Sequence, residues 1–170
     1  MIHEFCDFEI IGARKRVLNK GKFIDELNSF SNNKAVIQAI NASVICGIEH
    51  IEFALKKALE SWEKDPISSN LGIEILLHTL GLRQINKAIE KGGIEEGEAD
   101  LCLIFSDINW KDLETRFDLE RDDSILSPDK IDLKKIMDIF DISEEELNVV
   151  GSKKIPLLAR EKISLLRYEK

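Results

Sequence analysis

The spacing of the apolar residues changes along the chain, and this change restricts the fold more than any other feature of the sequence. Residues 35–40 and 99–105 form short apolar runs of the kind that buried strands have. Between these runs, from residue 43 to residue 64, apolar side chains recur every three or four positions, which is the period of an amphipathic helix. Strands separated by helical sequence indicate a small sheet that packs against helices. We therefore expect an α+β fold that is mainly helical by residue count.

The same patterns predict the remaining elements. We expect an opening strand over residues 4–11 and a basic loop at 14–22, and further helices over residues 23–30, 71–80, 82–91, 110–121, 131–140, 143–151 and 156–167. The glycine pair at 92–93 is expected to end its helix in the left-handed conformation. Ser143 and Glu146 have the spacing of a capping box.

The charge of the chain is unevenly distributed. The net charge is −8, from 24 basic and 32 acidic side chains in 170 residues. Residues 1–94 hold 12 basic and 12 acidic side chains, whereas residues 95–170 hold 12 basic and 20 acidic ones. This balance excludes a protein that coats nucleic acid non-specifically, but it allows one confined site on the neutral first part. A chain of this length usually forms one domain, and we expect a single domain over residues 1–170.

The three cysteines, Cys6, Cys46 and Cys102, are widely spaced and form no CxxC pair, so they predict neither a zinc site nor a redox dithiol. Cys46 and Cys102 lie in apolar runs and are expected to be buried thiols, which fits a reducing compartment. The N-terminus lacks the positive charge of a signal peptide. The longest apolar stretches are shorter than the ~20 residues that a membrane helix needs. The sequence thus predicts a cytoplasmic protein with no membrane segment, no metal and no cofactor.

The sequence contains no recognisable catalytic motif. Cys46 and His50 stand four residues apart and have the residue types of a nucleophile and its base, but nothing in the sequence orients the base. A small-molecule enzyme that uses this pair is kept as an alternative. The basic residues from Arg14 to Lys22 allow either a nucleic-acid contact or a solvated loop. From the residues alone, the best interpretation is a soluble binding or regulatory domain.

Several segments together resemble a known family. They are IEHIEFAL at residues 48–55, LGIEILL at 71–77, RQINKAIEKGGI at 83–94, the apolar run LCLIF at 101–105 and the tail at 157–166. In this combination they resemble the small kinase-binding subunit of the KEOPS complex, in its archaeal form. The basic residues at 14–22 and the acidic segment at 107–123 match no motif of that family, and their roles stay open.

The resemblance implies a function and a fold. KEOPS converts an adenosine beside the anticodon of tRNA to threonylcarbamoyladenosine, and a separate subunit catalyses the transfer. The present chain would be a non-catalytic regulatory subunit without a cofactor, which binds and stimulates the kinase-like ATPase subunit directly and contacts the other KEOPS subunits indirectly. It would also help to recruit tRNA through the single-stranded 3′ CCA end. The family fold is a small, largely antiparallel sheet packed with helices. A purely structural adaptor without tRNA affinity is the second alternative.

Physical chemistry narrows the residues that could serve these contacts. A CCA end offers phosphates and unstacked bases, so its site needs cations beside an apolar or aromatic platform. Our candidates for tRNA contact are the exposed polar residues of two predicted helices, Lys56, Lys57, Lys64, Arg83, Gln84 and Lys87; ordinary solubilising charges are the competing interpretation. Our candidates for kinase contact lie in the last helix, Leu157, Leu158, Leu165 and Leu166, because apolar residues spread around more than one face. Complete burial inside this domain is the competing interpretation there.

Overall fold

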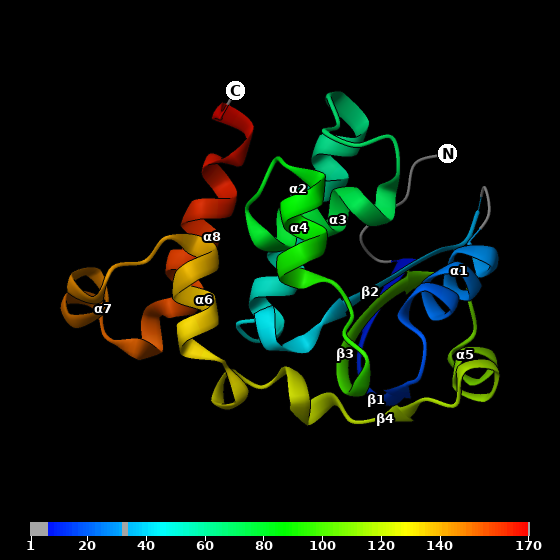
Figure 1. Ribbon diagram of the computed structural model, residues 1–170. Coiled ribbons are helices and arrows are strands. Elements are labelled where there is room, and N and C mark those ends of the chain that lie inside the picture. Colours follow the sequence, from blue (N-terminus) through cyan, green and yellow to red (C-terminus); the bar gives the residue numbers. More distant parts are fainter. Residues whose placement is uncertain (1–6, 32–33, 170) are drawn as a thin grey trace.

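A computed structural model describes residues 7–31 and 34–169 of the chain (Figure 1). Its strands are β1 (Phe8–Val17), β2 (Val36–Asn41), β3 (Gly97–Ser106) and β4 (Glu120–Arg121). Its α-helices are α1 (Lys20–Phe30), α2 (Ile48–Lys64), α3 (Leu71–Leu80), α4 (Ile85–Gly92), α5 (Trp110–Phe117), α6 (Leu133–Phe140), α7 (Glu144–Val150) and α8 (Ile155–Leu165). Short 3-10 helices are η2 (Ala42–Val44), η3 (Asp123–Leu126), η4 (Pro128–Lys130), η5 (Ser152–Lys154) and η6 (Leu166–Tyr168).

The four strands form one antiparallel sheet in the order β2-β3-β1-β4. β3 pairs with β1 over the whole length of both strands, from Phe8 opposite Ser106 to Val17 opposite Gly97. β2 pairs with the other edge of β3, and β4 adds only two residues to the outer edge of β1. This sheet, with helices on its faces, confirms the predicted α+β class and the antiparallel arrangement that the family resemblance implies.

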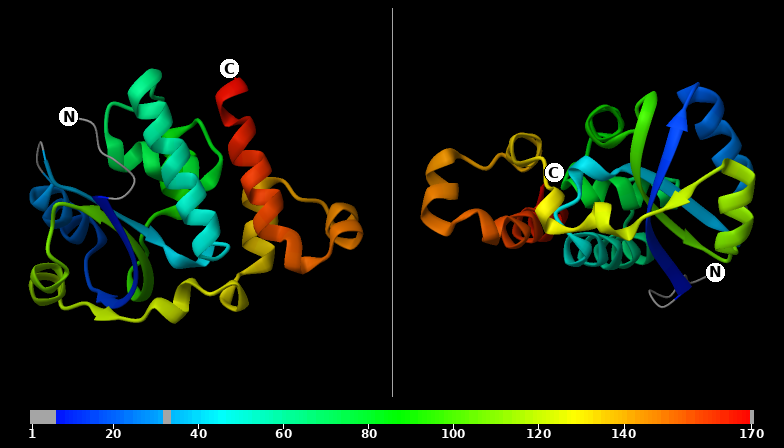
Figure 2. Two further views of the ribbon diagram at one scale, coloured as in Figure 1. Left: turned by 180° about the vertical axis from the view of Figure 1, so that it is seen from behind. Right: turned by 90° about the horizontal axis from the view of Figure 1, so that it is seen from below.

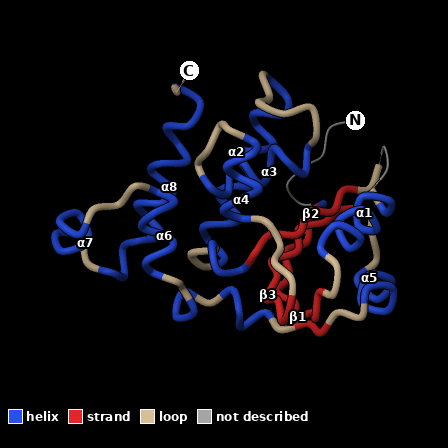
Figure 3. Tube along the Cα trace, viewed as in Figure 1, coloured by secondary structure: helices blue, strands red, loops and turns tan. Residues whose placement is uncertain are grey.

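The sheet is covered on both faces, and the core is therefore divided into two clusters (Figures 1 and 3). α1 and α5 pack on Leu101, Leu103 and Phe105 of β3. Helices of the larger cluster, led by α2 and α3, pack on Cys102 and Ile104 from the opposite side. Successive side chains of a strand point to opposite faces. A strand that is covered on both sides thus needs an unbroken apolar run, which is what residues 101–105 supply.

Three helices of the larger layer position the candidate site. α3 lies at the centre of this layer, where it packs against β2, α2, α4 and α8, and almost all of its side chains are buried. α8 runs beside α2 (Figure 2) and turns Ile155, Ala159 and Ile163 inward. α2 and α8, which are about a hundred residues apart in the sequence, therefore lie side by side and form two walls of the candidate site.

Gly81 ends α3 in the left-handed conformation, with φ 63°, and the chain turns there toward α4. Glycine adopts this region at no steric cost, so the predicted break at this position has a backbone cause. The prediction of a left-handed cap at residues 92–93 was wrong. Gly93 has φ −69°, because the chain leaves α4 in an extended conformation on its way to β3.

The first strand extends further than the sequence pattern indicated. β1 includes residues 14–16, and α1 begins at Lys20, so the predicted basic loop is part strand and part helix. Arg14 and Arg16 sit on the exposed side of the strand and pair with Asp100 and Glu98 of β3. Residues 4–6 of the predicted opening strand lie outside the described residues.

Two helix boundaries also differ from the prediction. The helix expected from residue 43 begins at Ile48, because a 3-10 turn and Gly47, with φ 95°, precede it. The helix expected over 110–121 ends at Phe117, because Asp118 adopts the left-handed conformation and the chain enters β4. The capping box of Ser143 and Glu146 is confirmed.

Candidate functional site

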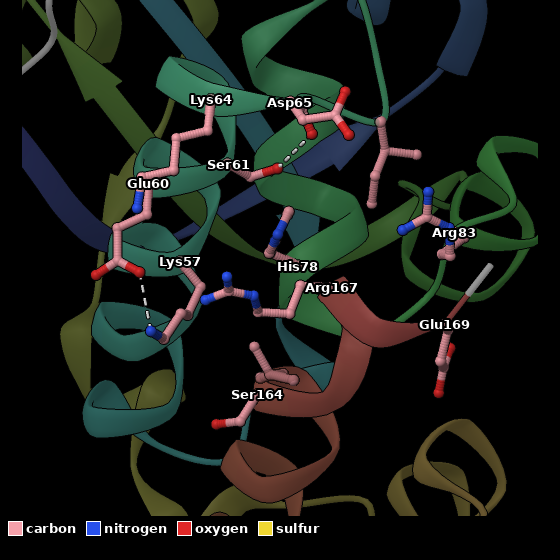
Figure 4. A pocket seen from close by; sticks show the side chains of 12 residues that line it. Lys57, Glu60, Ser61, Lys64, Asp65, His78, Arg83, Ser164, Arg167 and Glu169 are labelled. Carbon is pink, nitrogen blue, oxygen red and sulfur yellow. Dashed lines mark hydrogen bonds and ion pairs between the residues drawn. The ribbon is translucent and has the colours of Figure 1, made fainter.

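A pocket of about 280 Å³ lies between the C-terminal half of α2, the turn after α3 and the end of the chain (Figure 4). The side chains that line it are mostly polar or charged: Lys57, Glu60, Ser61, Lys64, Asp65, Ile67, His78, Arg83, Ile163, Ser164, Arg167 and Glu169. Figure 4 shows Arg167 extending from the C-terminal segment toward α2, where Lys57 lies. The pocket thus joins elements that only the tertiary fold brings together.

The structure brings three of the six predicted tRNA-contact residues to this pocket, Lys57, Lys64 and Arg83. The other three, Lys56, Gln84 and Lys87, are exposed but lie outside its lining. Lys56 precedes Lys57 on α2, and successive residues of a helix point about 100° apart. Gln84 is the N-cap residue of α4, and Lys87 lies in the first turn of that helix, beyond the pocket.

The sequence interpretation missed seven polar or charged residues of the same pocket: Glu60, Ser61, Asp65, His78, Ser164, Arg167 and Glu169. Arg167 is the most consequential of them, because it adds a fourth permanent cation to Lys57, Lys64 and Arg83. Its position follows from the packing of α8 against α2, and no local sequence pattern reports that packing.

The cations of the pocket differ in how they are engaged. Lys57 forms an ion pair with Glu60 at 2.9 Å, and this hydrogen bond holds the pKa of Glu60 below its usual value. Arg83 donates a hydrogen bond from Nη1 to the main-chain carbonyl of Leu166 at 3.3 Å. Within the described part of the chain, neither Lys64 nor Arg167 forms an ion pair, and the Arg167 guanidinium lies over the ring of Tyr168, 5.1 Å from its centroid.

The bottom of the pocket differs from its rim. Among the lining residues, His78 and Ile163 are the buried ones, with exposed fractions of 5% and 2%, whereas Lys64, Arg83 and Arg167 are exposed. Behind His78 lies Glu74, which is completely buried. The entrance is therefore lined by charged side chains, the carboxylates of Glu60, Asp65 and Glu169 as well as the four cations. An apolar side chain and an imidazole lie at its inner end.

Hydrogen bonds satisfy the buried carboxylate of Glu74. It accepts one from the Ser61 hydroxyl and one from the Ser68 main-chain N–H, each at 2.8 Å. Buried carboxylates are tolerated when they are bonded in this way. The network fixes α3 against the end of α2, and thereby the wall that carries His78.

The four leucines predicted for kinase contact lie in different environments. Leu157 and Leu165 are exposed, with exposed fractions of 55% and 48%, and Tyr168 follows on the same segment at 70%. Leu158 is half-buried and packs on the core. Leu166 is completely buried, because it continues the inward face formed by Ile155, Ala159 and Ile163. Its side chain is therefore not on the surface that a kinase could contact.

The arrangement of Cys46 and His50 does not support the enzyme alternative. His50 Nδ1 accepts a hydrogen bond from the Cys46 main-chain N–H at 2.9 Å, and Nε2 donates one to the Thr79 carbonyl at 2.8 Å. Both ring nitrogens are therefore engaged by the backbone, and neither is left to deprotonate the thiol. Burial raises the pKa of Cys46 to about 12, whereas an activated nucleophile has a depressed thiol pKa. As predicted, Cys46 and Cys102 are buried free thiols.

The basic residues at 14–22 are largely neutralised. Arg14 bridges Asp100 and Asp122, and Lys15 donates to the Phe117 carbonyl while lying over the ring of Phe23. Contacts of this kind stabilise the attachment of β4 and α5 to β1. Arg16 and Lys22 form longer ion pairs, with Glu98 at 3.8 Å and with Glu26 at 3.9 Å. No helix in the described residues has the length and apolar character needed to cross a membrane.

Comparisons with known proteins place this geometry in a family context. Residues 14–164 match the family model described as kinase binding protein CGI-121. The regulatory protein Cgi121 of Methanocaldococcus jannaschii is 31% identical over 116 residues, which cover 68% of this chain and 77% of that relative. The family match includes Lys57, Lys64 and Arg83 and ends before Arg167.

Proposed function

The chain belongs to the CGI-121 family of kinase-binding proteins, and we propose that it is the regulatory, non-catalytic subunit of a KEOPS complex. In this role it binds and stimulates the kinase-like ATPase subunit, and it helps to recruit the tRNA that receives threonylcarbamoyladenosine. The observation that carries the tRNA part is a pocket that brings four cations together, beside three carboxylates, above a buried and partly apolar bottom. We also propose a cytoplasmic location, which the free thiols of Cys46 and Cys102 support.

The outer face of α8 is the proposed contact for the kinase-like subunit. Leu157 and Leu165 lie two turns apart on one exposed face, and Tyr168 continues it. Large exposed apolar side chains that cluster on a helix commonly mark protein interfaces, and a burial of this kind supplies most of the binding energy. The charged Glu161 lies between the two leucines on the same face, so a partner that covers both leucines would also contact its carboxylate.

The pocket is the proposed contact for the 3′ CCA end of tRNA. A single-stranded end offers phosphates that Lys64, Arg83 and Arg167 can bind, and bases that can pack on Ile67 and Ile163. The volume of about 280 Å³ is just below the usual range for ligand sites, roughly 300–1,000 Å³, so the pocket would hold only a small part of the tRNA end. The overall net charge of −8 makes a confined site more plausible than a broad nucleic-acid surface.

The two proposed contacts share one segment of the chain. Leu165 points outward, whereas Ser164 and Arg167 line the pocket and Leu166 is buried between them. A kinase-like subunit on α8 would therefore lie next to the tRNA end. This adjacency supports a subunit that presents tRNA to its partner.

One set of binding experiments tests the proposal. The purified chain is mixed with the kinase-like ATPase subunit, and complex formation and ATPase rate are measured. Binding of intact tRNA and of tRNA without its CCA end is measured in parallel. We expect complex formation, a faster ATPase, and tRNA affinity that depends on CCA. Absence of the complex would refute the kinase part, and equal affinity for trimmed tRNA would refute the CCA part. A complex without any tRNA affinity would support the structural-adaptor alternative.

A further inference from the structure

One ring nitrogen at the inner end of the pocket, Nε2 of His78, has no role in the phosphate binding proposed for the cations. His78 lies in the last turn of α3, is 5% exposed and lines the pocket. Its other nitrogen, Nδ1, lies 2.9 Å from the main-chain carbonyl oxygen of Glu74 and 3.5 Å from the carboxylate Oε1 of the same residue. These two distances determine which nitrogen carries the proton.

Both neighbours of Nδ1 are oxygen acceptors, so Nδ1 carries a proton and donates it to the Glu74 carbonyl. In the neutral ring Nε2 then has a free lone pair and can only accept. Within the described residues, Ser106 Oγ is the one sealed side-chain polar atom without a partner. Nε2 is therefore not sealed, and since no protein group bonds to it, it opens on the pocket.

Charged groups on every side influence the protonation of this ring. Glu74 of α3 favours the protonated form, whereas burial, the largest effect, and the cations Arg83 and Lys57 oppose it. Together they lower the pKa of His78 below 6.5. The other charged groups of the pocket act by their sign: the cations Lys64 and Arg167 oppose protonation of the ring. The carboxylates of Glu60, Asp65 and Glu169 favour it. At neutral pH the inner end of the pocket thus presents a hydrogen-bond acceptor.

We propose that His78 is a specificity-determining residue of this pocket, whose Nε2 accepts a hydrogen bond from the exocyclic amino group of a cytosine or adenine base. The inference rests on the proposed binding of a tRNA 3′ end here. Ile163 and His78 are the two buried residues of the lining, so a base that enters beyond the exposed cations would bring its edge to His78. Cytosine and adenine carry an amino donor at that edge, whereas uracil and hypoxanthine carry a carbonyl oxygen. An oxygen there would face the Nε2 lone pair without a proton between them.

Base replacement in the tRNA tests this assignment on the unaltered protein. Four tRNAs are compared: the intact CCA end, each cytidine separately replaced by uridine, and the terminal adenosine replaced by inosine. We expect one of the three replacements to weaken binding roughly threefold to tenfold, the value of one hydrogen bond. If none weakens binding while removal of CCA still does, the proposed function stands and the role of His78 is refuted. If removal of CCA has no effect, both fail.

Two variants assign the effect to one atom. His78→Asn keeps an N–H that can reach the Glu74 carbonyl but removes the acceptor at Nε2, so it should bind the replaced and intact tRNAs equally well. Ser29→Ala changes a side chain outside the pocket that bonds within its own helix, to the Glu26 carbonyl, and should keep the discrimination of the wild type. Discrimination that survives in His78→Asn would refute the proposal.

The pH dependence of binding separates an acceptor from a phosphate clamp. Protonation removes the Nε2 lone pair, so the affinity of the wild type for intact tRNA should fall as the pH is lowered from about 8 to about 5. A histidine that binds phosphate would require the protonated form, and affinity would then rise over the same range. His78→Asn should lack the acid-dependent loss. An affinity that rises toward acid pH in the wild type alone would overturn the inference.

Discussion

Arg83 and Leu166 are 83 positions apart in the sequence, yet Nη1 of Arg83 donates a hydrogen bond to the main-chain carbonyl of Leu166 at 3.3 Å. This bond joins the turn between α3 and α4 to the end of α8. Leu166 is completely buried, so its carbonyl is a fixed point, and Arg83 is held at the edge of the pocket by it. The residue therefore combines a structural contact with a charge that faces the proposed ligand.

Replacement of Arg83 should weaken tRNA binding. Arg83→Ala removes one cation from the rim, and we expect a loss of about 1 kcal/mol, or roughly fivefold in affinity. Arg83→Lys keeps the charge but not the planar donor group, so its affinity for tRNA should lie between that of the wild type and that of Arg83→Ala. The control is Lys87→Ala, which removes an equal charge from the neighbouring helix outside the pocket. Equal losses for Arg83→Ala and Lys87→Ala would indicate a diffuse charge effect and not a site.

Charges on the outer face of α8 should weaken kinase binding without unfolding the protein. Leu157→Asp and Leu165→Asp each place a carboxylate in the proposed interface, and we expect at least a tenfold loss of affinity for the kinase-like subunit, about 1.4 kcal/mol. Because both positions are exposed, the free energy of unfolding should change by less than about 0.5 kcal/mol. Val149→Asp is the matched control, since Val149 is 86% exposed on α7. Unchanged binding in both leucine variants would exclude this face.

The sequence predicted the helical layer well, because the apolar period of α2 and α3 directly reports their buried faces. It predicted β1 poorly. The exposed residues Arg14 and Arg16 alternate with buried Ala13 and Val17, but the charged side chain of Lys15, which lies on the inward face, hides this alternation. Lys15 is accommodated there because its stem crosses the Phe23 ring and its ammonium group reaches the Phe117 carbonyl. Phe23 and Phe117 belong to helices and not to the strand that contains Lys15, so these contacts can be identified only from the three-dimensional structure.

The candidate site was half predictable for a similar reason. Lys57, Lys64 and Arg83 could be chosen because they belong to strongly periodic helices or to the family segments. Arg167 could not, since its role depends on the packing of α8 beside α2. The tail also carries leucines on several faces, so its period does not state which of Leu165 and Leu166 is buried. Tertiary packing decides this in favour of Leu166.

The thiol of Cys46 should be unreactive in the native protein. Burial raises the pKa values of Cys46 and Cys102 to about 12, so at a given pH the thiolate fraction is roughly a thousandfold lower than for a free cysteine. A Cys6→Ser variant removes the third thiol, which lies outside the described residues. We expect alkylation at pH about 8 to be slow until denaturant is added. Rapid native labelling of Cys46 would restore the small-molecule enzyme as a candidate.

Protonation of His50 should destabilise the fold in acid. His50 is completely buried with both ring nitrogens bonded to backbone groups, and burial lowers its pKa from 6.5 to about 4. The unfolded chain therefore binds a proton on this residue at a higher pH than the folded chain does. Stability is consequently lost as the pH falls from about 6.5 to about 4, by roughly 3 kcal/mol for this residue.

A comparison of denaturation curves isolates this contribution from the other titrating groups. His50→Asn can still accept the bond from the Cys46 N–H but cannot take up a proton, so it should cost stability at pH about 7 and lose less of it toward acid. The gap in unfolding free energy between the wild type and His50→Asn should therefore shrink by roughly 3 kcal/mol between pH about 7 and about 4. His78, whose pKa is also lowered, titrates in both proteins and cancels from the difference. Parallel curves over this range would show that His50 is not held neutral in the folded protein.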